Sequence, residues 1–322
     1  MAERKTMSEV DRLINTLLSP SLERKTYGSM ADWFESFNQQ TRGFSQPIDR
    51  AMLGGRLSLN VGFAFASAYQ SAIEALFKPQ DILLSSFCVT EEQGNHPRAI
   101  GTRLFEDAGK LYLSGHKKFV SGANDSQQLY IACRDEREGK GIDAQGRPII
   151  KMVATKAKSK GLEIQAMPAL GFVPEVSHGK VKLNNVQITE EQICRGDGYL
   201  NYVKAFRSYE DLHVLAAITA YRLAEAIEGK WPIDIVEAHI SLILAIRSLS
   251  EMDLNKPAAH IALAACRSQL DVLILNTNSL FEQHSSQAYA LWERDKILLS
   301  IAKTAHQKRT QGAWNKFTDI EM

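Results

Sequence analysis

Two short segments carry side chains whose types and spacing suit the binding of a planar ring with a polar rim. The first, Phe87-Cys-Val-Thr-Glu-Glu-Gln-Gly-Asn-His96, reads as a strand end that leads into a polar turn. The second, Ser114-Gly-His-Lys-Lys-Phe-Val-Ser-Gly-Ala123, reads as a strand that presents Phe119 and Ser121 on the same face. Phe119 would then pack on the ring, while the hydroxyls of Thr90 and Ser121 hydrogen-bond its rim. Such pairs also occur in ordinary sheets, so a purely structural role stays open.

Composition narrows the class of protein. The 322 residues are 44% hydrophobic and 23% charged, which is typical of a globular chain and excludes a mainly disordered one. Lys and Arg number 38 against 37 Asp and Glu, so the chain lacks the excess of basic residues that is typical of nucleic-acid-binding proteins. The eight His and four Cys show no metal-ligand or C-x-x-C spacing, so we expect no metal site. The cysteines do not suggest a disulfide framework, and we expect the protein to be located in the reducing cytoplasm. No stretch of about 20 apolar residues predicts a membrane span, and the charged N-terminal residues do not resemble a secretory signal.

Hydrophobic periodicity divides the chain into three parts. Residues 1–82 read as helical, with helices expected at 10–18, 30–40 and 57–77. Residues 83–195 read as short strands separated by turns, which favours an antiparallel barrel or sandwich. Residues 196–322 read as a four-helix bundle, with helices at 202–226, 233–251, 258–281 and 287–314. The predicted fold class is therefore α+β multidomain, in the order helical domain, β domain, helical bundle.

The two ring-binding segments resemble the middle domain of the acyl-CoA dehydrogenases. That family carries a C-V-T-E-P-G-A-G-S-D type loop and a G-x-K-x-W-I-T-N type strand, which appear here as C-V-T-E-E-Q-G-N-H and G-H-K-K-F-V-S-G. The resemblance continues through Glu175 to Ile188 and Gly196-Asp-Gly198, and Arg294-Asp295 resembles the pair that opens the family's last helix. It covers roughly residues 50–320 and implies the same order of helical, β and helical segments.

The resemblance implies that the chain binds FAD. It places the flavin ring against Phe87, Cys88, Val89 and Thr90 of the first segment and against Phe119, Val120 and Ser121 of the second. Asn95 falls where the family has a Ser that helps to hold phosphate or pantetheine, because the loop is one residue shorter here. The family's R-x-x-F-G and G-G-x-G motifs, which contribute to the FAD site of the neighbouring subunit, are missing.

The reaction implied by the resemblance is α,β-dehydrogenation of an acyl thioester, which needs one carboxylate to abstract the α-proton. Counting from Arg294-Asp295 places Lys303 at the family's usual Glu, and an ammonium group cannot accept a proton. Counting from Gly196-Asp-Gly198 places Asp211 at the alternative base position on the first helix of the bundle, with Glu210 beside it. The sequence thus leaves Asp211, Glu210 or a solvated helix face as open interpretations.

The partners follow from the same resemblance. They are acyl-CoA or another acyl thioester as substrate, an electron-transfer flavoprotein or another electron acceptor, and a second copy of the chain in a homodimer or homotetramer. The Ala- and Leu-rich faces at 212–227 and 258–275 are the predicted seams between copies. The alternative is a non-catalytic relative that binds an acyl thioester or a protein through the same fold.

Overall fold

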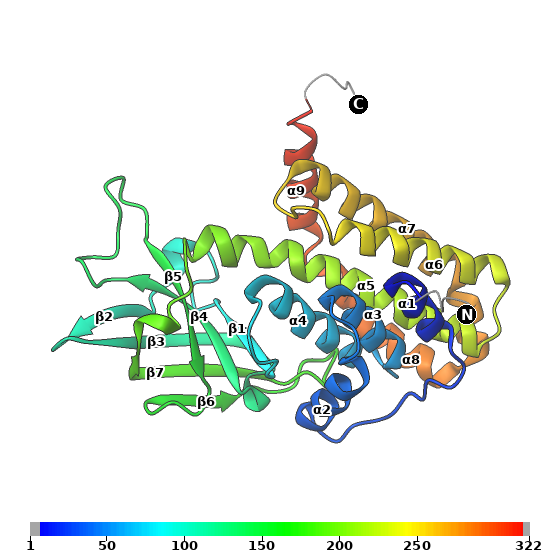
Figure 1. The fold of residues 1–322 in the computed structure, drawn as a ribbon, viewed down its shortest axis with the longest axis horizontal. Helices are drawn as coiled ribbons and strands as arrows, with labels where there is room; N and C mark the ends of the chain where they lie inside the picture. The colour runs from blue at the N-terminus through cyan, green and yellow to red at the C-terminus, as the bar shows by residue number, and fades with distance from the viewer. Residues whose placement is uncertain (1–6, 318–322) are drawn as a thin grey trace, which may run out of the picture.

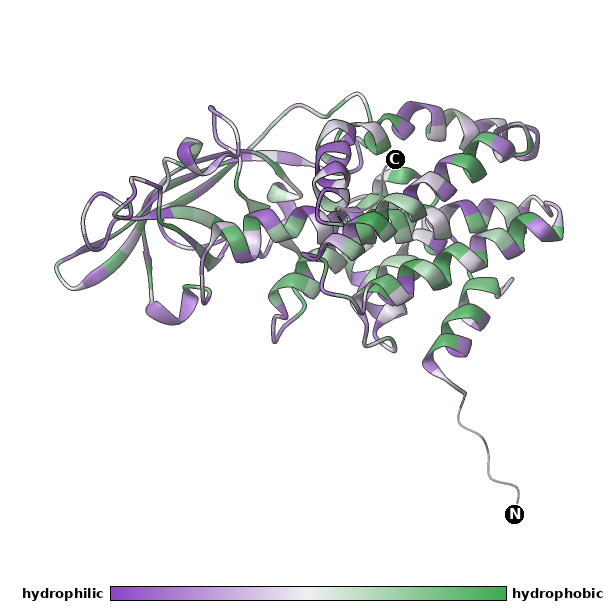
Figure 2. Ribbon diagram, turned by 90° about the horizontal axis from the view of Figure 1, so that it is seen from above, coloured by the Kyte–Doolittle hydropathy of each residue, from purple (hydrophilic) through white to green (hydrophobic). Residues whose placement is uncertain are grey.

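The computed structural model describes residues 7–317. A twisted sheet lies at one end of the molecule and helices fill the other, and the long helix α5 runs between the two (Figure 1). Hydrophobic residues concentrate in the helical end and alternate with hydrophilic ones along the strands (Figure 2), as expected for a sheet with one solvated face.

The N-terminal part holds four helices, α1 (Glu9–Leu18), α2 (Met30–Thr41), α3 (Pro47–Leu57) and α4 (Val61–Phe77). The sequence pattern predicted a single helix over 57–77 and missed α3. The reason is that α3 is buried on all sides, including Asp49, Arg50 and Arg56, so it shows no apolar stripe.

The sheet contains β1 (Ser85–Cys88), β2 (Arg103–Asp107), β3 (Lys110–Ser121), β4 (Gln128–Asp135), β5 (Ile150–Lys156), β6 (Leu162–Ala166) and β7 (His178–Ile188). Its order is β1-β4-β2-β3-β7-β6, and β5 pairs with β4. The α+β fold class is confirmed, but the sheet is mixed rather than purely antiparallel. The β2–β3 hairpin lies between β1 and β4 in the chain, and β4 returns parallel to both β1 and β2.

The C-terminal part begins with a π-helical turn (Tyr199–Lys204) that leads into α5 (Ala205–Glu228). It continues with α6 (Ile233–Leu249), α7 (Pro257–His284), α8 (Ser286–Asp295), a 3₁₀ turn (Lys296–Ser300) and α9 (Lys303–Trp314).

The single helix predicted over 287–314 is wrong, since the chain turns after Asp295. That side chain is fully buried and accepts hydrogen bonds from Arg294 and from the Val173 amide. No Pro or Gly marks the turn, so the sequence pattern could not reveal it. Arg294-Asp295 accordingly ends α8 instead of opening the last helix.

The first and third parts of the chain share one hydrophobic core. Leu13 and Leu17 of α1 pack in the same cluster as Leu212 and Leu215 of α5 and Leu242 of α6. Gly55 of α3 lies so close to the carbonyl group of Ala217 that a Cβ there would overlap it. The seam predicted at 212–227 is therefore wrong, because that face is buried inside the chain. The division at residues 82 and 195 remains a prediction.

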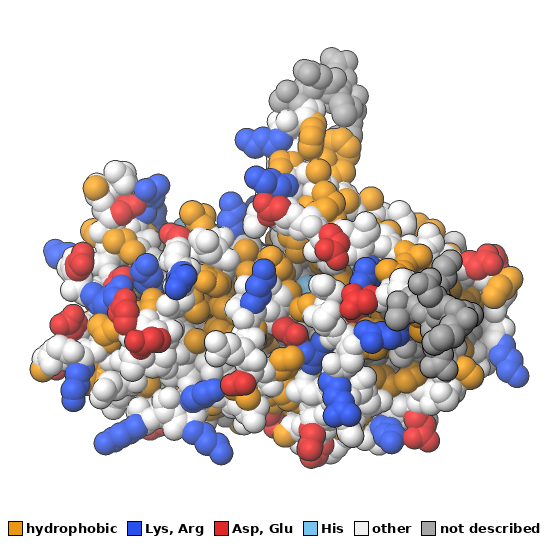
Figure 3. Space-filling model, viewed as in Figure 1, with side chains coloured by type: hydrophobic (Ala, Val, Ile, Leu, Met, Phe, Trp, Pro, Cys, Tyr) orange, Lys and Arg blue, Asp and Glu red, His pale blue; other side chains and the backbone are white. Residues whose placement is uncertain are grey.

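Helix α7 leaves part of its apolar surface uncovered. Leu263, Leu270 and Phe281 pack into the core, whereas Val272 and Leu275 are 55% and 75% exposed. Among the described residues, α7 has the length and mean hydropathy of a membrane-crossing helix. Helices in the core of soluble proteins can have the same length and hydropathy. Helix α9 stands away from the body beside α7 (Figure 1), and the surface there carries both apolar and basic side chains (Figure 3).

Candidate active site

Asp211 on α5 is held by basic side chains from two other helices. Its carboxylate accepts a hydrogen bond from His306 Nε2 at 2.7 Å and another from the Arg309 guanidinium, and Arg267 lies 3.8 Å away. Burial alone would raise the pKa of Asp211, but His306 and Arg309 outweigh it and lower the pKa below the ordinary value. Asp211 is therefore an ionised anchor that ties α9 and α7 to α5.

Glu210, the preceding residue, has the opposite surroundings. It is half-buried and makes no side-chain hydrogen bond or ion pair within residues 7–317. Burial, reinforced by the negative charge of Asp211 and opposed by Arg207, raises the pKa of Glu210 to about 8. A carboxyl group tuned in this way can gain and lose a proton near neutral pH, as a general base must.

Glu210 faces a small apolar cavity of about 260 Å³. The cavity wall comes from α4, from the loop between β6 and β7, from α5 and from the turn before α9. The apolar side chains that line it are those of Phe65, Leu170, Phe172, Val173, Val214, Leu298, Leu299, Ile301 and Ala302. The polar side chains of His178, Glu210, Asp211, Arg267 and His306 complete the lining, so the space combines a polar rim with an apolar part that leaves room for a small acyl chain.

Arg294 fixes the loop that closes this cavity. Its guanidinium donates to Glu175 at 2.8 Å and to Asp295 at 2.7 Å, and Asp295 accepts from the Val173 amide. The β6–β7 loop is thus fastened to the end of α8. The pair singled out in the sequence has a positioning role at the cavity wall.

A larger cleft of about 790 Å³ opens beside the cavity and shares Glu210, Asp211, Ala302 and His306 with it. Asn95 lines the cleft from the β domain, and Lys204, Arg207 and Arg309 line it from the helices. The shared residues make the two spaces adjoin, and the cations suit a ligand whose outer part is anionic. Asn95 thus lines this cleft, and its role in holding phosphate or pantetheine stays a prediction.

The first ring-binding segment presents only some of its side chains. Cys88 is fully buried inside the sheet and Val89 is 6% exposed, so Cys88 can contact a ligand through its backbone alone. The Phe87 ring packs 4.3 Å from that of Phe206, and its amide donates to the Tyr69 hydroxyl at 2.8 Å. Thr90 is half-buried, and its carbonyl accepts from the Lys118 amide at 2.8 Å, which brings the two segments together.

The second segment carries an unusual backbone. Phe119 has a φ of 54° and its side chain is 51% exposed, whereas Val120 is 1% exposed and points into the sheet core. A β-bulge between Lys117 and Val120 produces this geometry. Positive φ at a bulky residue is strained, and such strain collects at functional sites. The exposed Phe119 ring fits the predicted role of a platform for a planar group.

Ser121 connects this platform to the cavity. His178 Nδ1 lies 3.1 Å from the carbonyl oxygen of Val176, which can only accept, so Nε2 is free to accept from Ser121 Oγ at 3.3 Å. Burial lowers the pKa of His178 and favours this neutral form. His178 lines the cavity together with Glu210, and no sequence motif pointed to it.

A buried ion pair joins Glu91 of the first segment to Lys117 of the second. Lys117 is 1% exposed and its Nζ donates to Glu91 at 2.7 Å. The Glu91 carboxylate also accepts from the Gly101 amide and from the Thr102 amide and hydroxyl. The Glu of the loop motif and the Lys of the strand motif are therefore partners that lock the turn onto β3.

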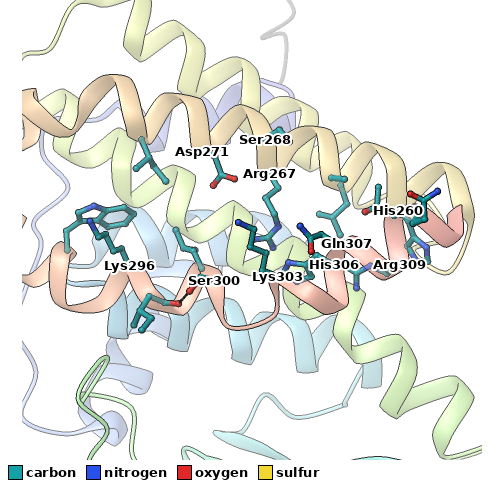
Figure 4. Close-up of a pocket in the computed structure, with 18 of the residues that line it drawn as sticks. His260, Arg267, Ser268, Asp271, Lys296, Ser300, Lys303, His306, Gln307 and Arg309 are labelled. Atoms are coloured by element: carbon teal, nitrogen blue, oxygen red, sulfur yellow. Dashed lines mark hydrogen bonds between the residues drawn. The ribbon is translucent and has the colours of Figure 1, made fainter. Parts of the chain in front are cut away.

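Lys303 lies away from the cavity. It is exposed at the start of α9 and borders a groove of about 860 Å³ between α7 and the α8–α9 segment. Figure 4 shows Arg267 of α7 reaching toward His306 and Lys303 across this groove. No group of three metal-ligating side chains occurs within residues 7–317.

No family model matches the chain, and no curated protein matches it. Solved structures do. Butyryl-CoA dehydrogenase from Megasphaera elsdenii has a TM-score of 0.64 and 12% identity, covering 96% of this chain and 99% of its own. FkbI, for biosynthesis of a methoxymalonyl extender unit, has a TM-score of 0.60 and 14% identity, covering 97% and 100%. The prolyl acyl carrier protein oxidase AnaB has a TM-score of 0.56 and 14% identity, covering 85% and 82%. The chain therefore has the acyl-CoA dehydrogenase fold, which confirms the resemblance seen in the sequence.

Proposed function

We propose that the chain is an FAD-dependent oxidoreductase that dehydrogenates an acyl thioester, with Glu210 as the base that removes the α-proton. The single observation that carries this proposal is the environment of Glu210, a carboxyl group with a pKa of about 8 at the wall of an apolar cavity. Asp211, the other candidate, is occupied by His306 and Arg309 and has a lowered pKa.

Each part of the site has a proposed role in substrate binding or proton transfer. The apolar wall around Phe65 and Val214 holds the acyl chain and excludes water. Glu210 in its ionised form accepts the α-proton as the Cα–H bond breaks and the Cα–Cβ double bond forms. Asn95, Lys204 and Arg207 hold the outer, anionic part of the thioester in the adjoining cleft.

FAD, when bound, supplies the acceptor for the hydride that leaves the β-carbon. The residues that fit its ring are Phe119, Thr90 and Ser121, together with backbone groups of Cys88, Val89 and Val120. The exposed, strained Phe119 ring supports this assignment.

The neighbours in fold support an acyl thioester but differ in the carrier, since butyryl-CoA dehydrogenase is named for a coenzyme A thioester and AnaB for an acyl carrier protein. The electron acceptor, the homodimer or homotetramer and the cytoplasmic location remain predictions. The exposed Val272 and Leu275 on α7 support a contact between copies at the 258–275 seam.

The test is to purify the protein, record its visible spectrum with and without added FAD, and titrate it anaerobically with acyl thioesters of increasing chain length. The proposal expects flavin absorption that is bleached by short-chain thioesters. A protein that binds thioester but takes up no flavin would instead be the non-catalytic relative.

A further inference from the structure

A basic cleft lies on the solvated face of the sheet, where β3, β6 and β7 present alternate side chains. The register places His116 of β3 opposite Lys182 and Gln165 of β6 opposite Lys180. The cleft has a volume of about 740 Å³. Its lining contains six cations, Arg98, Lys117, Lys118, Arg134, Lys180 and Lys182, and only Glu91 and Glu92 as acids. The whole chain has a net charge of +1, so positive charge is concentrated here. Lys and Arg side chains also stand out along the lower edge of the molecule, where β6 and β7 lie (Figure 3).

Several of these cations already have acidic partners. Lys117 is paired with Glu91 inside the turn, Lys118 lies 2.8 Å from Glu92, and Lys182 lies 3.8 Å from Glu163 at an exposed contact. Arg134 lies 4.0 Å from Glu136 and donates to the Ile100 carbonyl. Within residues 7–317, Lys180 and Arg98 have no ion pair. The cleft therefore keeps an excess of positive charge, and its exposed pairs can exchange an acid for a ligand anion at little cost.

The cleft adjoins the Phe119 platform. Lys118 lines the cleft, and its Nζ lies 5.2 Å over the neighbouring Phe119 ring. On β7, His178, Lys180 and Lys182 follow one another at two-residue steps and share a face, about 7 Å apart at each step. One end of this row contacts Ser121 and lines the apolar cavity, and the other end lines the cleft.

We propose that this cleft binds the phosphate groups of a nucleotide whose planar ring lies against Phe119, with Lys180 and Lys182 as the main phosphate contacts. An aromatic platform next to cations that are unpaired, as Lys180 is, or held only in an exposed pair, as Lys182 is, matches the two parts of such a ligand. The identification of the ring as flavin rests on the proposed function. The cofactor's phosphates would then be held by the same chain that holds its ring. This would compensate for the missing R-x-x-F-G and G-G-x-G motifs, which in the family contribute to the FAD site of the neighbouring subunit.

The test compares ligands that differ only in phosphate. Riboflavin, FMN, FAD and ADP are titrated against the full-length protein by calorimetry. The double variant Lys180→Gln/Lys182→Gln is compared with the control Lys158→Gln/Lys160→Gln, which removes two exposed lysines from the β5–β6 turn. We expect the first variant to weaken FMN and FAD binding about tenfold or more, as loss of a charge-assisted contact does, with riboflavin affinity unchanged. The control should bind all four ligands like the wild type, and both variants should keep the wild-type Tm.

Each other outcome has a distinct meaning. Equal losses for riboflavin and FMN, or no loss for FMN, would overturn the phosphate site while leaving the proposed function intact. Binding of ADP that depends on Lys180 and Lys182, with no binding of any flavin, would support the cleft and overturn the proposed function. Absence of binding by all four ligands would overturn both.

Discussion

Glu210 and Asp211 are neighbours on α5 whose carboxyl groups meet opposite environments. Asp211 is fixed by His306 and Arg309 and has a lowered pKa, whereas Glu210 faces an apolar cavity and has a pKa of about 8. Both side chains line the same cavity and cleft, but within the part of the chain that the structure describes only Asp211 is paired with basic side chains. Under the proposed function this difference gives anchoring to Asp211 and proton transfer to Glu210, and it can be tested with each residue in turn.

Asp211→Asn should loosen α9. The change removes the negative charge that offsets His306, Arg309 and Arg267, so we expect the free energy of unfolding to fall by about 1–3 kcal/mol. Hydrogen exchange in 303–314 should accelerate more than in α6. The control is Asp271→Asn on the exposed face of α7, which should change the stability by less than about 0.5 kcal/mol.

The Asp211 effect should depend on pH in a definite direction. A carboxyl group whose folded-state pKa is lowered stabilises the protein above its unfolded pKa of about 3.9, and this stabilisation is lost as pH falls through the folded-state value. Denaturation curves of the wild type and Asp211→Asn should therefore differ most at neutral pH and converge below about pH 4. A difference that grew on acidification would contradict the ion-pair account.

Glu210→Gln should raise the free energy of unfolding at high pH, whereas Asp211→Asn lowers it. The folded-state pKa of Glu210 is raised, so the wild type loses stability as pH rises from the unfolded value of about 4.3 toward 8. A neutral amide avoids this loss, so the stability of the variant relative to the wild type should rise by roughly 3–4 kcal/mol between pH 5 and pH 9. Urea titrations at the two pH values measure the difference. A variant less stable at pH 9 would show that Glu210 is ionised and paired.

Breaking the Lys117–Glu91 pair should be costly. Glu91→Gln leaves a buried ammonium group without its partner, and we expect a loss of about 3 kcal/mol. The double variant Glu91→Gln/Lys117→Met should recover much of this loss. Glu92→Gln, which breaks the exposed pair with Lys118, serves as control and should cost less than about 1 kcal/mol. Additive effects at Glu91 and Lys117 would argue against direct coupling.

Phe119→Ala should weaken flavin binding without unfolding the protein. The ring is 51% exposed and contributes little to the core, so the Tm should hold. Loss of a stacking contact should reduce flavin affinity about tenfold. The control is Phe105→Ala, which removes a ring that packs on Tyr112 on β2 and β3 and should leave flavin affinity unchanged.

The sequence could predict the parts of this site that are local. The C-V-T-E and G-x-K segments show strand spacing and motif resemblance, and the structure joins them through the Lys118 amide and the Thr90 carbonyl. The different environments of Glu210 and Asp211 could not be predicted, because His306 and Arg309 come from residues 95 and 98 positions further along the chain. Helix α3 and the turn after Asp295 were missed for a related reason, since burial and a tertiary hydrogen bond rather than sequence pattern define them.

The most direct measurement of the central claim is solvent deuterium exchange at the α-carbon of a bound acyl thioester, followed by mass spectrometry. Glu210→Gln should slow this exchange by about 10²–10⁴-fold, the usual contribution of a general base. Asp211→Asn should slow it by less than about tenfold, since the Asp211 carboxylate is held by His306 and Arg309 and is not the proposed base. In the wild type the exchange rate should rise with pH toward a plateau above about pH 8, as the Glu210 carboxyl group loses its proton. Exchange that survives in Glu210→Gln and disappears in Asp211→Asn would contradict the assignment.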